Sequence, residues 1–295
     1  RFMQIVFKSF KKVCESRNDT ASSAYLDDLA GRLSAAAEAR AWEKDRYIRG
    51  SYDSGALLGS ASSEQCCIDI LPQAFSVFAE GANDRTVLAM KTAYEKLYDD
   101  KNKLFALFTP AFGTHRKEAG YVSGYCEGFR ENGGHYTHAA VWGAMALIRA
   151  GLVEEGIQAL RYINPAVRAS CKMLADSYRS EPYAICGDIR TNKEHLGEGG
   201  WGLYTGAAGW YCKAFLEDIC GYREYGEYFT LSPALSDSFS EYSLRIERKG
   251  CVFYINARLS DSYSCTLDRK PHENRFYFDS QNHIIEITVE KGRRI

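Results

Sequence analysis

The chemically active side chains are most crowded at positions 120–138, which read GYVSGYCEGFRENGGHYTH. Within nine residues, around a pair of glycines, stand a guanidinium (Arg130), a carboxyl group (Glu131) and two imidazoles (His135 and His138). The glycines allow close backbone approach to a ligand, and His138 would begin the next helix, whose first NH groups and dipole favour an anion. The segment is therefore a candidate site for phosphate or sugar. The alternative is a polar loop in which Arg130 and Glu131 only pair with their neighbours.

A second candidate is GGWGLYTGAAGW, from Gly199 to Trp210. Thr205 and Gly206 stand where a helix would begin, so a hydroxyl group and free backbone NH groups converge as an oxyanion requires. Small residues in this position could instead serve only to let two helices pack closely.

The third candidate, AWEKDRYIRG at positions 41–50, combines Trp42 with the carboxyl groups of Glu43 and Asp45 and with Arg49. A carboxylic acid beside an indole ring can stay protonated and serve as a general acid. Charged residues at a helix end more commonly form a solvated corner.

Helices must position these three segments. Apolar residues recur at three- and four-residue spacing, and we expect helices over 22–40, from a cap at Asp84 to Leu97, and over 138–150, 153–162, 166–178 and 205–220. The connections between them are long and rich in glycine and aromatic residues, as in loops that carry binding groups. After about Phe229 the apolar pattern changes to period two, which predicts antiparallel strands. We expect two domains, a helical one at 1–228 and a β-layer at 229–295.

Composition excludes several classes of protein. Lys plus Arg (37) nearly equals Asp plus Glu (38) among 295 residues, so no net field attracts nucleic acid or an anionic membrane. The ten cysteines form no CxxC motif and no zinc-like cluster, which favours a reduced, cytoplasmic compartment and no metal. No run reaches the roughly 18 apolar residues of a membrane span. Because the chain starts at Arg1 without an initiator methionine, in what resembles the middle of a helix, we expect a fragment of a longer protein.

The order of these motifs resembles glycoside hydrolase family 94, the cellobiose, chitobiose and β-1,2-oligoglucan phosphorylases and cyclic β-1,2-glucan synthases. The resemblance rests on AWEKDRYIRG, GSASSEQCCIDILPQAF, GYCEGFRENGGHYTHAAVW, EPYAICGD and GGWGLYTGAAGW, in that order, and runs from about residue 20 to residue 260. It implies a mainly α fold, part of an (α/α)6 barrel followed by a small antiparallel β-layer. It also implies inverting phosphorolysis without a cofactor, in which inorganic phosphate is the co-substrate, one carboxylic acid protonates the leaving oxygen and the product is an α-sugar 1-phosphate.

The resemblance also assigns roles. His138, Thr205 and Gly206 match the phosphate-binding residues of the family. Substrate-binding residues are expected at Trp42, Arg49, Gln73, Tyr121, Tyr125, Arg130 and Glu131. The forms RENGGHYTHAA, EPY and GGWxxYTGxAGW favour a β-1,2-glucan as substrate.

Two departures from the family pattern leave alternatives open. The WDG-type motif that carries the family's acid reads Trp42-Glu43-Lys44 here, with Asp45 next. Either Glu43 is the acid with altered geometry, or Asp45 replaces it, or catalysis is impaired. The phosphate-clamping arginines would lie upstream, so the expected partners are an upstream barrel half, a β-sandwich and, as one further option, a second copy in a homodimer. A non-catalytic glucan-binding scaffold is the main alternative function, and ordinary hydrolysis by a related barrel is another.

Overall fold

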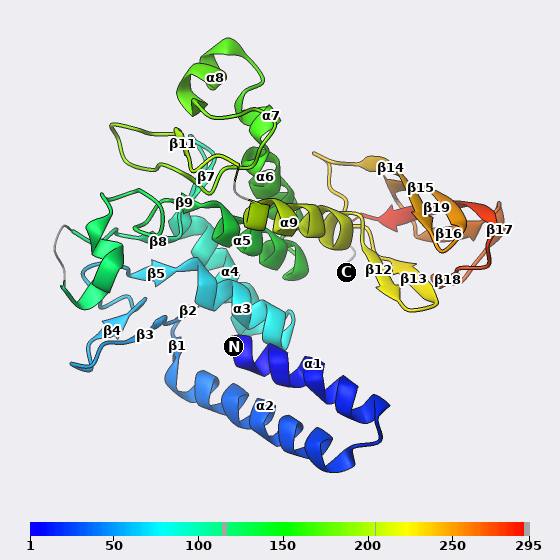
Figure 1. The fold of residues 1–295 in the computed structure, drawn as a ribbon, viewed down its shortest axis with the longest axis horizontal. Helices are drawn as coiled ribbons and strands as arrows, with labels where there is room; N and C mark the ends of the chain where they lie inside the picture. Colours follow the sequence, from blue (N-terminus) through cyan, green and yellow to red (C-terminus); the bar gives the residue numbers. More distant parts are fainter. Residues whose placement is uncertain (114–116, 204, 292–295) are drawn as a thin grey trace.

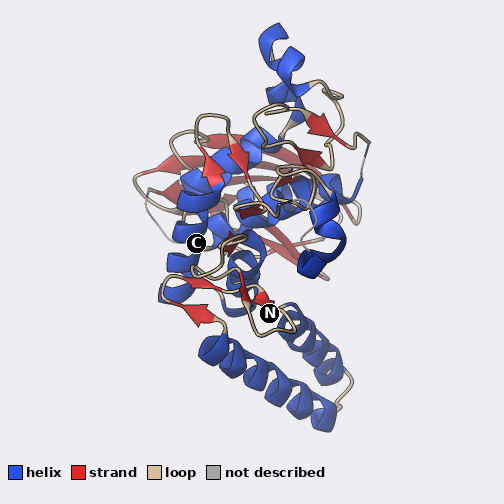
Figure 2. Ribbon diagram, turned by 90° about the vertical axis from the view of Figure 1, so that its left-hand side faces the viewer, coloured by secondary structure: helices blue, strands red, loops and turns tan. Residues whose placement is uncertain are grey.

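The structure, a computed structural model, describes residues 1–113, 117–203 and 205–291. Its first part is helical and its last part is a β-sheet region, as the sequence predicts (Figure 1). The helices are α1 (Phe2–Ser16), α2 (Thr20–Arg40), α3 (Ile70–Glu80), α4 (Asp84–Leu97), the 3-10 segment η1 (Lys117–Gly124), α5 (Thr137–Arg149), α6 (Val153–Ile163), α7 (Pro165–Arg168), α8 (Lys172–Tyr178), α9 (Thr205–Lys213) and the π-helical η2 (Ala214–Ile219). The α1–α2 hairpin projects from one end of the helical part and α8 from the other (Figures 1 and 2).

Local chemistry explains several differences from the expected helices. The cap of α4 is Asn83 rather than Asp84, because Asn83 accepts bonds from the NH groups of Arg85 and Thr86 while Thr86 bonds back to it. The expected helix 166–178 is divided into α7 and α8, and the last helix continues as a π-helix after Lys213. The sequence analysis did not predict α3, a short and mostly apolar helix that Asp69 caps.

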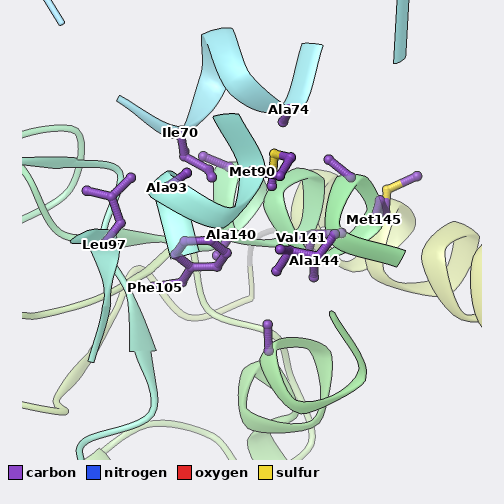
Figure 3. Packing of buried hydrophobic residues seen from close by; sticks show 14 of the residues in the cluster. Ile70, Ala74, Met90, Ala93, Leu97, Phe105, Ala140, Val141, Ala144 and Met145 are labelled. Atoms are coloured by element: carbon purple, nitrogen blue, oxygen red, sulfur yellow. The ribbon is translucent and has the colours of Figure 1, made fainter. Parts of the chain in front are cut away.

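The main core lies where α3, α4, α5 and α6 pack together (Figure 3). Helix α5 is buried along most of its length, and a methyl group at Gly156 of α6 would lie 2.5 Å from Ile148 Cγ1. Glycine at this position therefore lets α5 and α6 approach closely. The rigid α3–α5–α6 packing fixes the directions in which the starts of α3 and α5 point.

Short antiparallel pairs of strands join the helices. They are β1 (Trp42–Glu43) with β2 (Arg46–Tyr47), β3 (Gly50–Ser51) with β4 (Leu57–Leu58), β5 (Ile68–Asp69) with β8 (Phe108–Thr109), β6 (Tyr98–Asp99) with β7 (Leu104–Phe105), and a three-stranded sheet of β9 (His135–Tyr136), β10 (Asp188–Ile189) and β11 (Gly199–Gly200). Strand β5 leads directly into α3 and β9 directly into α5. These pairs hold the long loops that carry the predicted site residues.

The β-sheet region contains two sheets. One has the order β12 (Tyr222–Tyr225), β13 (Tyr228–Leu231), β18 (Phe276–Tyr277), and the other β14 (Glu241–Arg248), β15 (Cys251–Ser260), β19 (Asn282–Glu290), β16 (Ser264–Leu267), β17 (Lys270–Pro271). Their facing apolar side chains form a second core around Phe229, Phe253 and Phe276. The prediction of purely antiparallel strands is wrong in one respect, since β15 and β19 are parallel. The chain passes through β16, β17 and β18 before β19 returns beside β15 in the same direction.

Candidate active site

Three helices begin at one end of the helical part. Asp69 caps α3, His138 lies in the first turn of α5, and Gly206 lies in the first turn of α9. Asp69 and Ala139 line one pocket, so the starts of α3 and α5 lie near each other. A methyl group on Gly206 would lie 3.7 Å from Cε1 of His138, so α9 begins beside the start of α5. The first NH groups of a helix have no partner within it, which favours an anion at the starts of α5 and α9. At the start of α3 the NH groups of Ile70 and Leu71 already bond to the C=O of Leu107 and to Asp69.

His138 lies at the centre of the part of this site that suits a bound anion. Its ring lies 4.4 Å from the ring of Trp142 and 6.1 Å from that of Trp210. Its Nε2 is shielded from solvent and has no hydrogen-bond partner among the described residues. Burial lowers the pKa of His138, so the imidazole is neutral at neutral pH and can donate one N–H to a ligand.

His135 has a different role, although the same segment contains it. Its side chain is 1% exposed, and its Nδ1 accepts a bond of 2.8 Å from the NH of Phe105. Burial lowers the pKa of His135 to about 3. This histidine is a neutral support for the strand that precedes α5.

A pocket of about 270 Å³ opens beside α5 and gathers three predicted substrate residues, Arg49, Tyr121 and Glu131. The remaining lining residues are Tyr52, Leu58, Cys66, Asp69, Leu71, Leu107, Phe108, Phe112, Ala119, Val122, Tyr136, Ala139 and Trp142. Two shielded polar atoms in this lining, Oε2 of Glu131 and Nε1 of Trp142, have no partner within the described chain. Since an unpaired buried polar atom is costly, both are available to bind the hydroxyl groups of a ligand.

Asp69 is a pocket residue that the sequence analysis did not single out. It is 4% exposed, and its Oδ1 accepts a bond of 2.7 Å from the NH of Leu71. Its Oδ2 lies 3.6 Å from Nη1 of Arg49. Burial raises the pKa of Asp69 to about 6, although Arg49 opposes the shift. An aspartate directly before the apolar run ILPQAF is the sequence signal that could have revealed this helix cap.

Tyr125 and Arg130 lie close together beside the pocket but do not line it. The Arg130 guanidinium lies over the rings of Trp201, at 3.5 Å, and Tyr125, at 5.0 Å. The backbone of Arg130 has a φ of 47°, and its NH donates to Oδ2 of buried Asp188 at 3.0 Å. Asp188 therefore anchors a strained turn that directs Arg130 onto these rings.

The two predicted catalytic carboxyl groups, Glu43 and Asp45, do not reach the pocket. Both oxygens of Glu43 accept hydrogen bonds, from the Ser60 hydroxyl at 2.8 Å and the Ala61 NH at 2.9 Å. Asp45 forms a two-bond ion pair with Arg46, which holds the pKa of Asp45 below its ordinary value. Each group is thus engaged by residues that lie outside the pocket lining, and neither Glu43 nor Asp45 lines the pocket itself.

Trp42 and Gln73 lie in the same supporting layer as this hairpin. The Trp42 ring packs edge-on against Tyr47 at 4.9 Å. Gln73 is fully buried, and its amide bonds to both the NH and the C=O of Tyr47 at 2.8 Å. Gln73 thus holds the hairpin through Tyr47 and is not among the residues that line the pocket, and its role as a substrate contact stays a prediction.

Thr205 begins α9, but its side chain lies outside the described part of the structure. Among residues 1–113, 117–203 and 205–291, no cluster of three or more His, Cys, Asp or Glu could hold a metal ion. No helix in those ranges has the length and apolar character needed to span a bilayer.

Comparison with known proteins identifies the family. The profile of the glycosyl hydrolase 94 superfamily, catalytic domain, matches residues 1–221. The chain belongs to this superfamily. The match ends at Gly221, immediately before β12, so it covers the helical part and stops where the β-sheet region starts.

The relatives include a glucan synthase and several phosphorylases. The chain is 34% identical over 256 residues to the cyclic beta-(1,2)-glucan synthase NdvB of Rhizobium meliloti, covering 86% of the chain and 9% of that protein. It is 23% identical over 256 residues to N,N'-diacetylchitobiose phosphorylase of Vibrio furnissii, which covers 85% of the chain and 31% of the relative. For cellobionic acid phosphorylase of Neurospora crassa the identity is 22% over 264 residues, with 87% and 32% covered. The chain thus spans about a third or less of these relatives.

Proposed function

We propose that this chain supplies the phosphate-binding part of the catalytic site of a glycoside phosphorylase that acts on β-linked gluco-oligosaccharides. The observation that carries the proposal is His138, whose shielded Nε2 has no partner and whose ring faces Gly206 where helices begin. A neutral N–H donor beside the start of a helix suits an oxyanion, and hydrolysis by water needs no such anion site.

The reaction that fits this site is an inverting displacement. A phosphate oxygen held at His138 and the start of α9 forms a bond to the anomeric carbon of the sugar. The bond from that carbon to the glycosidic oxygen breaks, and a carboxylic acid gives the leaving oxygen its proton. Attack from the opposite face converts a β-glucoside into α-glucose 1-phosphate. No cofactor is required, and phosphate is the co-substrate.

We propose that the proton donor is a carboxyl group other than Glu43 and Asp45, because both are engaged outside the pocket. Further helices of the full-length protein would complete an (α/α)6 barrel around α3, α5 and α9, with a β-sandwich as a separate domain. The β-layer would form the second domain of this chain, predicted at 229–295, although its strands begin at Tyr222. A β-1,2-linked glucan is the favoured substrate, and the similarity to a cyclic β-1,2-glucan synthase supports this preference.

The test uses the full-length protein with β-1,2-gluco-oligosaccharides, with and without inorganic phosphate. We expect α-glucose 1-phosphate only when phosphate is present, and a roughly hundredfold lower rate for His138→Ala because an oxyanion donor is lost. Oligosaccharide binding without any phosphorolysis would instead support the scaffold function. Release of free glucose in phosphate-free buffer would support hydrolysis.

A further inference from the structure

Asp69 and Arg49 form an ion pair inside the candidate active site. The Asp69 side chain is 6% exposed and Arg49 is 42% exposed, so a fixed carboxyl group faces a guanidinium that reaches solvent. The carboxyl group is held by the NH of Leu71 at the start of α3. The backbone of Arg49 is also fixed, since its NH donates to the C=O of Leu58 at 2.8 Å. Only the long side chain of Arg49 remains free to move.

Arg49 stands at the junction of two pockets. The first is the 270 Å³ pocket beside α5, and the second, of about 470 Å³, opens toward Arg1 and Phe2. Arg49, Leu71 and Trp142 line both. The two pockets are therefore adjacent compartments separated by these side chains, an arrangement that suits neighbouring sugar units of one oligosaccharide.

We propose that Asp69 is a positioning residue, which holds the Arg49 guanidinium at this junction so that its N–H groups bind the hydroxyl groups of two adjacent sugar units. The inference rests on the proposed function, because it takes an oligosaccharide as the ligand. An unrestrained arginine side chain loses conformational entropy when it binds a ligand. A fixed carboxylate that already holds the side chain reduces this entropy loss on binding. The planar guanidinium carries five donors, enough to keep the ion pair with Asp69 and still reach a sugar.

The competing explanation is that Asp69 only caps α3. Asparagine separates the two roles, because it caps a helix as well as aspartate does but lacks the charge that holds Arg49. Asp69→Asn should therefore keep the fold and lose the positioning. Asp19→Asn is the matched control, since Asp19 caps α2 by accepting from the NH of Ser22 at 3.0 Å and lines neither pocket.

The experiment measures calorimetric binding of a β-1,2-gluco-oligosaccharide to the full-length protein without phosphate, so that turnover is not needed. We expect about tenfold weaker binding for Asp69→Asn and for Arg49→Gln, and wild-type binding for Asp19→Asn. The double variant should bind as weakly as Arg49→Gln alone, because Asp69 acts through Arg49. In steady-state assays KM for the oligosaccharide should rise while kcat changes little.

Other binding results would contradict either this inference alone or the proposed function as well. Wild-type binding by Asp69→Asn would overturn the inference and leave the proposed function standing, as would independent effects in the double variant. If Asp69→Asn does not fold, the test rests on Arg49→Gln alone. Oligosaccharide binding by Arg49→Gln at the wild-type level would also overturn the inference. Absence of oligosaccharide binding by the unaltered protein would overturn the proposed function and this inference with it.

Discussion

At the scale of single residues, the pairing of His138 with Gly206 is the feature on which the proposed chemistry depends. A methyl group at Gly206 would fit at 3.7 Å from the imidazole, in ordinary contact, yet it would occupy the space beside the ring. Gly206→Ala should therefore raise KM for phosphate about tenfold or more. It should leave the fold intact, since alanine in a helix is about 0.5–1 kcal/mol more favourable than glycine.

Gly209→Ala provides the control for this prediction. Gly209 lies in the same helix, and a methyl group there would meet nothing within 4 Å. It should give the same small gain in the free energy of unfolding without a change in KM for phosphate. If KM for phosphate is the same in the two alanine variants, the anion does not bind in the space beside His138.

Single residues also show how far sequence reasoning can reach. The type and order of His138 and Gly206 predicted a shared site, and the fold brings them together. Glu43 and Asp45 have suitable chemistry, but their direction depends on a hairpin whose Lys44 has a φ of 54°. The ion pair of Asp69 with Arg49 joins residues from different loops, and no spacing in the sequence reports that contact.

At the scale of secondary-structure elements, His283 of β19 links two turns of the β-sheet region. Its Nδ1 lies 2.7 Å from Oδ2 of Asp268 and its Nε2 lies 3.0 Å from Oδ1 of Asp279. Burial against Phe253 opposes the charged ring, but the two carboxylates outweigh burial and raise the pKa of His283. The NH of Ile284 and, second, His283 lower the pKa of Asp268, and His283 lowers the pKa of Asp279.

The pH dependence of stability follows from these directions. A raised histidine pKa gives stability that is complete below the unfolded value of about 6.5 and is lost as pH rises through the folded value. The lowered aspartate pKa values give stability that is present above about 3.9 and is lost as pH falls. The cluster therefore stabilises the β-sheet region most between about pH 4 and 6.5.

We predict that His283→Gln lowers the thermal midpoint by about 2–4 °C at pH 6 and by less at pH 8, in calorimetric scans. His272→Gln is the control, because His272 stacks on Phe276 in the same region without an ion pair to a carboxylate among the described residues. A His283→Gln effect that is the same at both pH values would show that the ring contributes only packing.

Secondary-structure elements could be predicted from the sequence where one local pattern of residues dominates. The period-two pattern located β14, β15 and β19, and the Lys249-Gly250 pair, both with positive φ, forms the tight turn between β14 and β15. The parallel pairing of β15 with β19 could not be predicted, because alternation of apolar residues does not record strand direction.

At the scale of the whole molecule, α1 presents an uncovered apolar face. Met3, Val6, Phe10 and Val13 recur at helical spacing and are 38–55% exposed. The relatives are about three or more times longer than the span they share with this chain, so we propose that another segment of the full-length protein covers this face. The incomplete barrel predicted from the sequence requires such a surface.

Phe10→Glu should then have a different effect in the 295-residue chain and in the full-length protein. In the 295-residue chain it should reduce self-association, measured by sedimentation, because it breaks the apolar face. In the full-length protein it should lower the free energy of unfolding by at least about 2 kcal/mol, because the side chain would be buried. Leu88→Glu, at an exposed position of α4, should do neither. Unchanged stability of full-length Phe10→Glu would contradict the covered face.

The choice of phosphate rather than water as the nucleophile is the central claim, and isotope labelling tests it most directly. The full-length protein is incubated with β-1,2-gluco-oligosaccharides and phosphate in ¹⁸O-water, and the products are analysed by mass spectrometry. Phosphorolysis at the His138 site predicts glucose 1-phosphate that carries no oxygen from water. Free glucose with ¹⁸O at its anomeric carbon, formed at a rate independent of phosphate, would contradict the account.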